Sequence, residues 1–156
     1  MRVTIFRPTL VYGPGNAGNM LRLLRLVQRG WPLPLGAVHN RRNLCYVGNL
    51  ASAITAAAKS RQARGLYVAC DRRAFSTVEL VRSLAHGMGR KAMLVPVPAA
   101  LLRAAAAALG QADAARRLLG SLEADSSKLE RELAWSPPFS EDEALRLTAR
   151  WFSELR

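Results

Sequence analysis

Two pairs of adjacent arginines are the residues best suited to binding chemistry in this sequence. Arg41 and Arg42 follow a proline-rich loop and precede a predicted strand, and Arg116 and Arg117 precede the apolar run 118–120. A guanidinium at the edge of a sheet can bind a diphosphate through two parallel hydrogen bonds. The alternatives are a solvent-exposed pair at the first position and an exposed helix end at the second.

Other residue types give little support to catalysis. The only histidines, His39 and His86, lack the spacing of metal ligands, and no Ser or Cys lies in a nucleophile-elbow sequence. Cys45 and Cys70 lie in apolar, strand-like runs and are predicted to be buried structural thiols. The acidic residues gather near the C-terminus, where helix first turns and solvated faces account for most of them. The sequence therefore supports neither a hydrolase nor a metalloenzyme, and general acid–base catalysis by those acids is a weaker alternative.

A glycine-rich turn, Gly13 to Gly18, matches G-x-G-x-x-G between a predicted strand and a predicted helix. A dinucleotide-binding loop also needs a tight turn directly after the strand and an acidic residue about 20 positions later. Here Arg7 and Pro8 interrupt the approach, and no acidic residue precedes Asp71. We therefore interpret the turn as a helix N-terminus that could face an anion.

The chain has 156 residues, a formal net charge of +12 and 50% hydrophobic residues, enough for one domain with a core. The first 70 residues contain ten basic residues and no acidic one, whereas the remainder contains 13 basic and 11 acidic residues. Such a charge distribution suits an anionic partner, although the arginine and alanine content can equally reflect a GC-rich genome. No apolar stretch approaches the ~20 residues of a membrane helix, and the N-terminus lacks a signal-peptide cleavage site. We therefore expect a cytoplasmic protein with no membrane partner.

Hydrophobic periodicity and turn signals predict a mixed α/β chain with more helix than strand. The predicted strands are 2–6, 9–12, 44–47, 66–70 and, as a strand or extended segment, 93–97. The first predicted helices run from 18 or 19 to Gly30 and from Asn49, as its cap, to about Lys59. A capping box of Ser76 and Glu79 begins a helix that ends at about Met88, and Pro98, as a first-turn residue, begins one that ends at Gly110. A short helix is predicted from Ser127 to Leu133, and a second capping box, Ser140 with Glu143, begins a helix that continues to the end. A linker is expected over 111–114.

The first predicted strand is so apolar that the rest of the chain offers too little sheet to bury it. Residues 3–6 suit burial on both faces of a parallel sheet, yet too few other strands are present to build that sheet. The chain therefore looks like the second part of a larger protein.

Five segments, in this order, resemble one known family. The segments Arg7 to Gly15, Pro32 to Gly36 and Arg42 to Ala51 closely resemble the extended short-chain dehydrogenase/reductase family, and within it the NAD-dependent epimerases and dehydratases that act on nucleotide-sugars. The segments Arg117 to Leu122 and Lys128 to Pro138 resemble the bacterial UDP-hexose 4-epimerase and 4-ketoreductase branch. The resemblance covers nearly the whole chain.

The resemblance implies a helix-rich, C-terminal part of a Rossmann-like enzyme that lacks most of the parallel sheet. Residues 1–156 would form the UDP-sugar-binding part, beginning at a late strand of a missing N-terminal NAD-binding domain. The helix start would contact the diphosphate, the backbone of the proline-rich loop would flank the uracil, and the arginines would bind the diphosphate. The substrate-binding residues implied in this way are Asn19, Met20, Leu33, Pro34, Leu35, Arg42, and one of Arg116 and Arg117.

One feature of the family is absent from this chain. The family uses a Tyr-x-x-x-Lys pair, in which the tyrosine exchanges a proton with the sugar 4-hydroxyl while NAD or NADP takes the hydride. Tyr12, Tyr46 and Tyr67 are each followed four positions later by a residue other than lysine. We therefore expect no catalytic residue, no metal and no bound NAD or NADP in this chain.

Two other interpretations stay open. One is a basic nucleic-acid-binding module built on the helix that carries Arg22, Arg25 and Arg29, and the other is a non-catalytic regulatory relative. The few aromatic residues are not interleaved with the arginines, so we expect no nucleic-acid partner. We also expect the apolar first strand to need a cover, by another copy, a swapped element or a rearranged N-terminus, and hence self-association.

Overall fold

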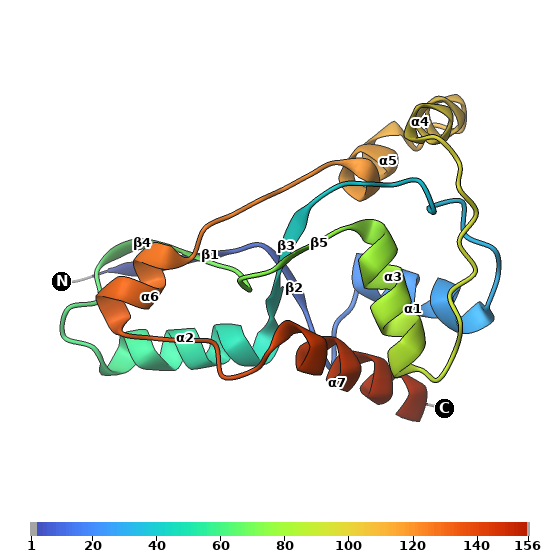
Figure 1. Ribbon diagram of the computed structural model, residues 1–156. Coiled ribbons are helices and arrows are strands. Elements are labelled where there is room, and N and C mark those ends of the chain that lie inside the picture. Colours follow the sequence, from blue (N-terminus) through green and yellow to red (C-terminus); the bar gives the residue numbers. More distant parts are fainter. Residues whose placement is uncertain (1–2, 156) are drawn as a thin grey trace.

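The computed structural model describes residues 3–155, so the predicted strand start at Arg2 lies outside the described residues. Within this range the chain is a helix-rich α/β structure with two small sheets (Figure 1). The strands are β1 (Thr4–Pro8), β2 (Leu10–Tyr12), β3 (Arg42–Tyr46), β4 (Gly65–Ala69) and β5 (Ala74–Phe75). The helices are α1 (Asn19–Arg29), α2 (Val47–Lys59), α3 (Thr77–Gly87), α4 (Ala99–Ala108), α5 (Ala112–Leu119), α6 (Ser127–Leu133) and α7 (Glu141–Glu154). None of these helices is long and apolar enough to cross a membrane.

One nearly continuous extended segment contributes a strand to each sheet. β1 pairs in parallel with β4, and β2, which follows β1 after Thr9, pairs in parallel with β3. The backbone N–H of Thr9 donates to the carbonyl of Ala69 at 3.1 Å, so the bend between the two strands keeps its hydrogen bonding. β5 pairs with β3 in the antiparallel direction. These pairings confirm the α/β class with a reduced parallel sheet.

The largest core cluster lies where α1, α3 and α7 pack against the β2–β3–β5 sheet. α3 and α7 cross closely at Gly87, where an added Cβ would lie 2.7 Å from the Cβ of Ala149. α3 begins at the predicted capping box, in which the Ser76 hydroxyl accepts from the Glu79 N–H and the Glu79 carboxylate accepts from the Ser76 N–H. The box is therefore confirmed, and it satisfies two backbone donors at the helix start.

A second cluster lies under one face of the β1–β4 pair, which α2 and α6 cover (Figure 1). On this face Phe6 packs with Tyr67, whose ring is fully buried. On the other face Val3, Ile5 and Leu66 are exposed. No described element packs over these three side chains, which agrees with the expectation that too few strands are present among residues 3–155 to bury β1 on both faces.

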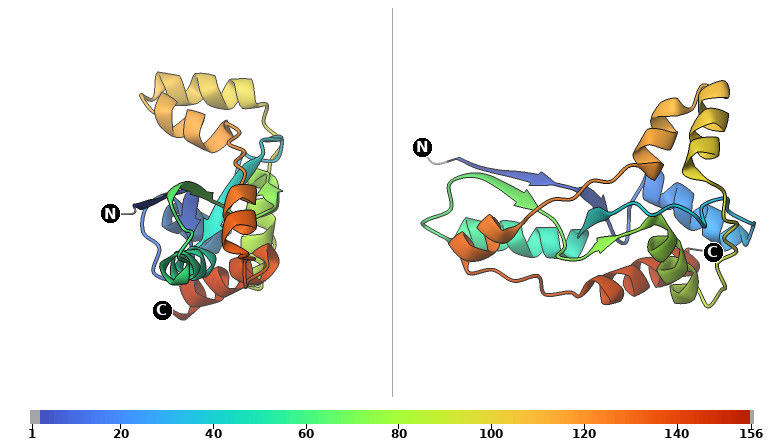
Figure 2. Two further views of the ribbon diagram at one scale, coloured as in Figure 1. Left: turned by 90° about the vertical axis from the view of Figure 1, so that its left-hand side faces the viewer. Right: turned by 45° about the horizontal axis from the view of Figure 1, so that its top comes forward.

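A third cluster joins α1, α3, the loop after α1 and a helical hairpin made of α4 and α5. The hairpin projects from the body of the molecule at the end away from the N-terminus (Figures 1 and 2). Leu102 of α4 and Ala115 of α5 contact this cluster, which includes Leu33, Leu35 and Leu119. The hairpin is therefore attached to the body by a small part of its surface.

Two helix starts differ from the predictions. α2 begins at Val47 after Tyr46, so Asn49 lies inside the helix and does not cap it. The side chain of Asn49 instead bonds to Asp71 and to the backbone of Phe139. The expected linker 111–114 is also wrong, because α5 already begins at Ala112.

Three further predictions are met in part. Pro98 is the cap residue of α4, one position before the first turn. The second capping box is half formed, since the Ser140 hydroxyl accepts from the Glu143 N–H at 3.4 Å. Segment 93–97 is extended, and its β-pairing is limited to one isolated bridge between Leu94 and Leu33.

Candidate functional site

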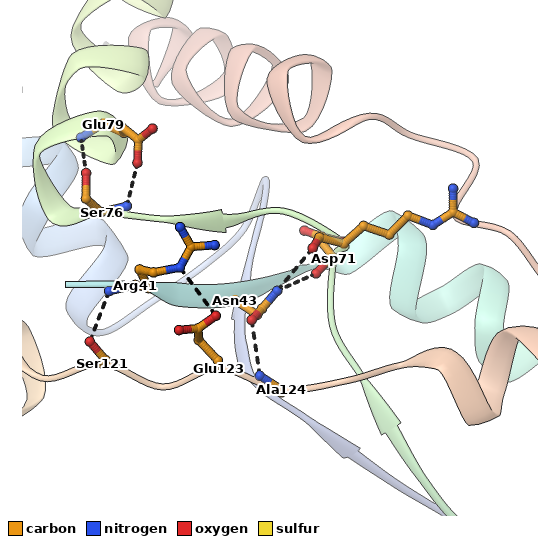
Figure 3. A network of polar contacts seen from close by, with 9 residues as sticks. Arg41, Asn43, Asp71, Ser76, Glu79, Ser121, Glu123 and Ala124 are labelled. Carbon is orange, nitrogen blue, oxygen red and sulfur yellow. Dashed lines mark hydrogen bonds and ion pairs between the residues drawn. The ribbon is translucent and has the colours of Figure 1, made fainter. Parts of the chain in front are cut away.

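Two buried asparagines hold the segment after α5 against β3. The Asn40 amide donates to the carbonyls of Leu118 and Gly120, both at 3.1 Å. The Asn43 carbonyl oxygen accepts from the N–H of Ala124 at 3.1 Å, and its amide donates to the carbonyl of Asp71 at 2.9 Å (Figure 3). The C-terminal end of α5 is thereby fixed beside the first residues of β3.

Arg42 begins β3 at this point. Its Nη1 donates to the carbonyl oxygen of Arg117. The neighbouring backbone forms a short ladder, in which the N–H of Leu122 donates to the Arg41 carbonyl at 2.8 Å and the N–H of Asn43 donates to Leu122 at 3.0 Å. The side chain of Arg42 is half buried, and this burial lowers its pKa, although an arginine stays charged at neutral pH. A positioned guanidinium therefore lies at the edge of the β3 sheet.

The arginines next to Arg42 and Arg117 have acidic partners. Arg41 pairs with Glu123 at 3.3 Å, and its backbone N–H donates to the Ser121 hydroxyl (Figure 3). Arg116 pairs with Asp113 at 3.8 Å on the exposed side of α5. Among residues 3–155, no acidic side chain pairs with Arg42 or Arg117. Of the predicted arginines, Arg42 and Arg117 are thus the two that keep their charge available for an anion.

The proline-rich loop packs into the cluster that also contains the end of α5. Leu33 and Leu35 are buried in the cluster that contains Leu119, two residues after Arg117, while Pro34 is exposed. Both backbone polar groups of Leu33 are used inside the chain: its N–H donates to Met93 and its carbonyl accepts from the residues at 35 and 95. Of the three predicted loop residues, Pro34 is therefore the one that a ligand can reach.

The predicted contacts at the start of α1 lie apart from this region. Asn19 is exposed, whereas Met20 is buried in the core between α1, α3 and β2. α1 joins the cluster of Leu33 through Val27 and Leu23, which lie eight and four residues, or roughly 12 and 6 Å, along the helix from Asn19. The structure thus places Arg42 against the backbone of Arg117, and Leu33 and Leu35 in the cluster of Leu119, while Asn19 and Met20 lie outside both sets of contacts.

A buried carboxylate was missed in the sequence. Asp71 follows β4, and its two oxygens accept from the Tyr46 N–H and from the Asn49 amide, each at 2.9 Å. Burial raises the pKa of Asp71, while the hydrogen bonds from Asn49 and Tyr46 oppose that rise. Burial, and to a lesser extent the negative charge of Asp71, raise the pKa of Tyr12. The sequence contained one indication of this role: Asp71 is the first acidic residue of the chain and directly follows a predicted strand.

Neither the cysteines nor the acids form a metal site in residues 3–155. Cys45 and Cys70 are buried free thiols, as predicted. Burial raises the pKa of Cys45 to about 12, which keeps it a thiol at neutral pH. Both side chains are therefore structural.

The chain is similar to known proteins along nearly its whole length. The model of the NAD dependent epimerase/dehydratase family matches residues 1–70. A UDP-glucose 4-epimerase from Vibrio cholerae is 36% identical over 154 residues, which cover 97% of this chain and 47% of the relative. The chain belongs to the NAD-dependent epimerase/dehydratase family.

Solved structures share the fold of this family member. A human epimerase family protein solved with NADPH superposes with a TM-score of 0.77 at 22% identity, over 96% of this chain and 48% of that chain. A UDP-glucuronic acid 4-epimerase from Bacillus cereus solved with NAD gives a TM-score of 0.73 at 19% identity, over 99% and 46%. The chain thus spans about half the length of the Vibrio relative and of both structures.

The glycine turn of this epimerase-family chain does not fit a dinucleotide cofactor. A Cβ at Gly13 would lie 2.4 Å from Cγ1 of Val47, so Gly13 allows the end of β2 to approach the start of α2. The Asn16 amide donates to the carbonyl of Val11 at 2.6 Å and closes the turn on itself. The turn therefore has a packing role and lacks the geometry of a dinucleotide-binding loop.

Proposed function

We propose that this chain is the substrate-binding part of a UDP-sugar 4-epimerase or 4-ketoreductase, and that Arg42 and Arg117 bind the diphosphate. The observation that carries this proposal is the pairing pattern of the arginines. Arg41 and Arg116 have acidic partners, whereas Arg42 and Arg117 lie together without one among residues 3–155. The similarity to a UDP-glucose 4-epimerase along 97% of the chain supports the substrate class.

Each element of the region has a role in this proposal. The Arg117 carbonyl holds Nη1 of Arg42, so that Nε and Nη2 can donate to phosphate oxygens in the bidentate manner typical of arginine. Exposed Pro34, held in place by buried Leu33 and Leu35, would pack against the flat face of the uracil. The asparagine contacts of Asn40 keep α5 in place, so these groups are ordered before the ligand binds.

Hydride transfer is assigned to residues outside this chain. Tyr12, Tyr46 and Tyr67 lack a lysine four positions later, and Tyr12 and Tyr67 are fully buried. The NAD-binding domain, the cofactor and the catalytic pair would belong to a separate half of the enzyme. We therefore expect the isolated chain to bind UDP and to convert no UDP-sugar, which NMR of the sugar products would check.

Calorimetry of the 156-residue chain with UDP tests the diphosphate assignment. Arg42→Ala and Arg117→Ala should each weaken UDP binding by about 1.5–3 kcal/mol, the range for hydrogen bonds to charged groups. Arg41→Ala is the matched control, because that side chain is paired with Glu123. Arg117→Ala keeps the backbone carbonyl that holds Arg42, so a folding defect in one variant does not explain both. Equal dissociation constants for wild type and both variants would remove the assignment.

The nucleic-acid hypothesis gives a different pattern in the same protein. Binding to random DNA would fall steeply with salt and would depend on many exposed arginines. UDP binding would depend on Arg42 and Arg117 in particular. Tighter binding to DNA than to UDP at physiological salt would favour the alternative.

A further inference from the structure

Helix α4 is more exposed than its composition allows for a self-contained domain. Nine of its ten residues are alanine or leucine, with one arginine. Among the helices of residues 3–155 it is the one without a buried residue. Leu101 is 62% exposed, and Leu109, directly after the helix, is 76% exposed. An apolar helix of this kind is normally covered by something.

The exposed side of α4 has a regular apolar pattern. Ala99, Leu102 and Ala106, at i, i+3 and i+7, are the half-buried positions, and Leu102 contacts the body of the molecule. Leu101, Ala104 and Ala108 recur at i, i+3 and i+7 on the opposite side and are exposed. The helix therefore presents an apolar stripe outward as well as a contact inward.

Two neighbouring segments extend this surface. Met93 and Val95 lie exposed in the segment that leads into α4, and Trp31, in the loop after α1, is 60% exposed. The two segments are joined by hydrogen bonds, in which Leu33 donates to Met93 and accepts from Val95, both at 2.8 Å. Both lie at the end of the molecule from which the hairpin projects (Figures 1 and 2). We call the set of Trp31, Met93, Val95, Leu101 and Leu109 the apolar end.

These segments carry several basic residues and no acidic residue. Arg29 lies over the Trp31 ring at 5.3 Å, Arg90 and Lys91 precede Met93, and Arg103 lies on α4. No acidic residue occurs before Asp71 or between Glu79 and Asp113. A second copy meeting this surface would bring like charges together, whereas an anionic lipid headgroup layer has the complementary charge.

We propose that the apolar end is a docking surface for an anionic membrane, inserted among the lipid headgroups. Tryptophan at the headgroup level, leucine and methionine below it and arginine or lysine around it are the side chains that interfacial binding uses. The sequence alone predicts no membrane partner, because hydropathy detects helices that cross a bilayer and not a short surface that lies on one. Trp31, Met93 and Val95 flank the loop that the proposed function assigns to uracil, but vesicle binding is measured without UDP, so the inference does not rest on the proposed function.

Vesicle flotation of the full 156-residue chain tests this inference. The probes are phosphatidylcholine vesicles with and without phosphatidylglycerol, at about 0.1 M and about 1 M salt, where the screening length falls from ~10 Å to ~3 Å. The wild type should float with the anionic vesicles at the lower salt, and binding should fall about tenfold or more without phosphatidylglycerol or at high salt. Trp31 fluorescence should shift to the blue on binding, and a Trp31→Phe variant identifies that signal.

The matched variants are L101E/L109E and Ile54→Glu. Leu101 and Leu109 are exposed, so the double variant should fold normally by circular dichroism and bind anionic vesicles about tenfold or more weakly. Ile54→Glu adds a charge at an exposed apolar residue of α2, remote from the hairpin, and should bind like the wild type. Absence of wild-type binding, or equal binding by the double variant, would overturn the proposal. So would a wild-type dimer that L101E/L109E dissociates while neither protein binds vesicles, because the surface would then join two copies.

Discussion

The two sheets of this chain are covered to different extents. The β2–β3–β5 sheet packs against α1, α3 and α7, and its cluster contains fully buried Tyr12, Leu44 and Leu84. The β1–β4 pair has α2 and α6 on one face, but on the other face Ile5 is 50% exposed. The same chain thus holds one sheet with a core of its own and one that is half covered. Stability is expected to concentrate in the first, and association in the second.

The largest expected effect is a cavity in the covered sheet's core. Leu84 of α3 is fully buried between α7 and the sheet, so Leu84→Ala should lower the free energy of unfolding by about 2–5 kcal/mol. Leu66→Ala, on the open face of β4, removes the same atoms and should cost less than about 1 kcal/mol. Urea denaturation of both variants makes the comparison. Similar losses would show that the open face is covered in solution.

Asp71 links the two sheets and gives the next effect. It follows β4, yet it accepts from the Tyr46 N–H at the end of β3 and from Asn49 of α2. Asp71→Ala removes the acceptor of the Tyr46 N–H and of one of the two Asn49 amide hydrogens, both buried, and should lower the free energy of unfolding by about 2–4 kcal/mol. Urea denaturation measures the loss, and Asp125→Ala, at an exposed acid, is the control. A loss below that of the control would mean that the sheets are joined by packing alone.

The Asp71 carboxyl also predicts a pH dependence. Because burial raises its pKa, the folded chain binds this proton more tightly than the unfolded chain does. Its contribution to stability is therefore greatest below the ordinary pKa of 3.8 and is lost as the pH rises through the raised value. The stability advantage of wild type over Asp71→Asn should shrink across this rise in pH. If the stability advantage of wild type instead grew with pH, burial would not be raising the pKa of Asp71.

The sequence predicted the covered sheet better than the links between elements. Helix boundaries such as Ser76 with Glu79 and the α1 end at Gly30 depend on local backbone chemistry, so they were visible in the residue order. The role of Asn49 depends on Asp71 and Phe139, which lie 22 and 90 positions away, and no local pattern shows such contacts. For the same reason the arginine pairs were found as candidates, but which member has an acidic partner depends on Asp113 and Glu123 after folding.

A smaller effect is expected at the capping box of α3, in the covered region. The Glu79 carboxylate accepts from the Ser76 N–H at 2.7 Å and pairs with Arg73, and these contacts lower its pKa. Their contribution is fully present above the ordinary pKa of 4.5 and is lost as the pH falls through the lowered value. Glu79→Gln keeps the hydrogen-bonding shape, and solvent screens the half-exposed charge, so the loss at neutral pH should be about 0.5 kcal/mol. Thermal unfolding should show this difference disappear in acid, and a constant difference would point to shape instead.

The smallest effect on stability is expected on the open face, where it accompanies a change in association. Ile5 of β1 lies beside Leu66 of β4 and is half exposed, so Ile5→Lys removes few contacts and should change the free energy of unfolding by about 0.5 kcal/mol or less. A lysine on an edge strand opposes pairing with a second copy, because two such strands would bring like charges together. Sedimentation at high protein concentration should therefore show a self-associating wild type and a more monomeric Ile5→Lys variant. Thr55→Lys on the exposed side of α2 adds the same charge away from this face and should leave association unchanged. A monomeric wild type would show that the open face alone does not drive association, and stability would then be the one property that separates the two sheets.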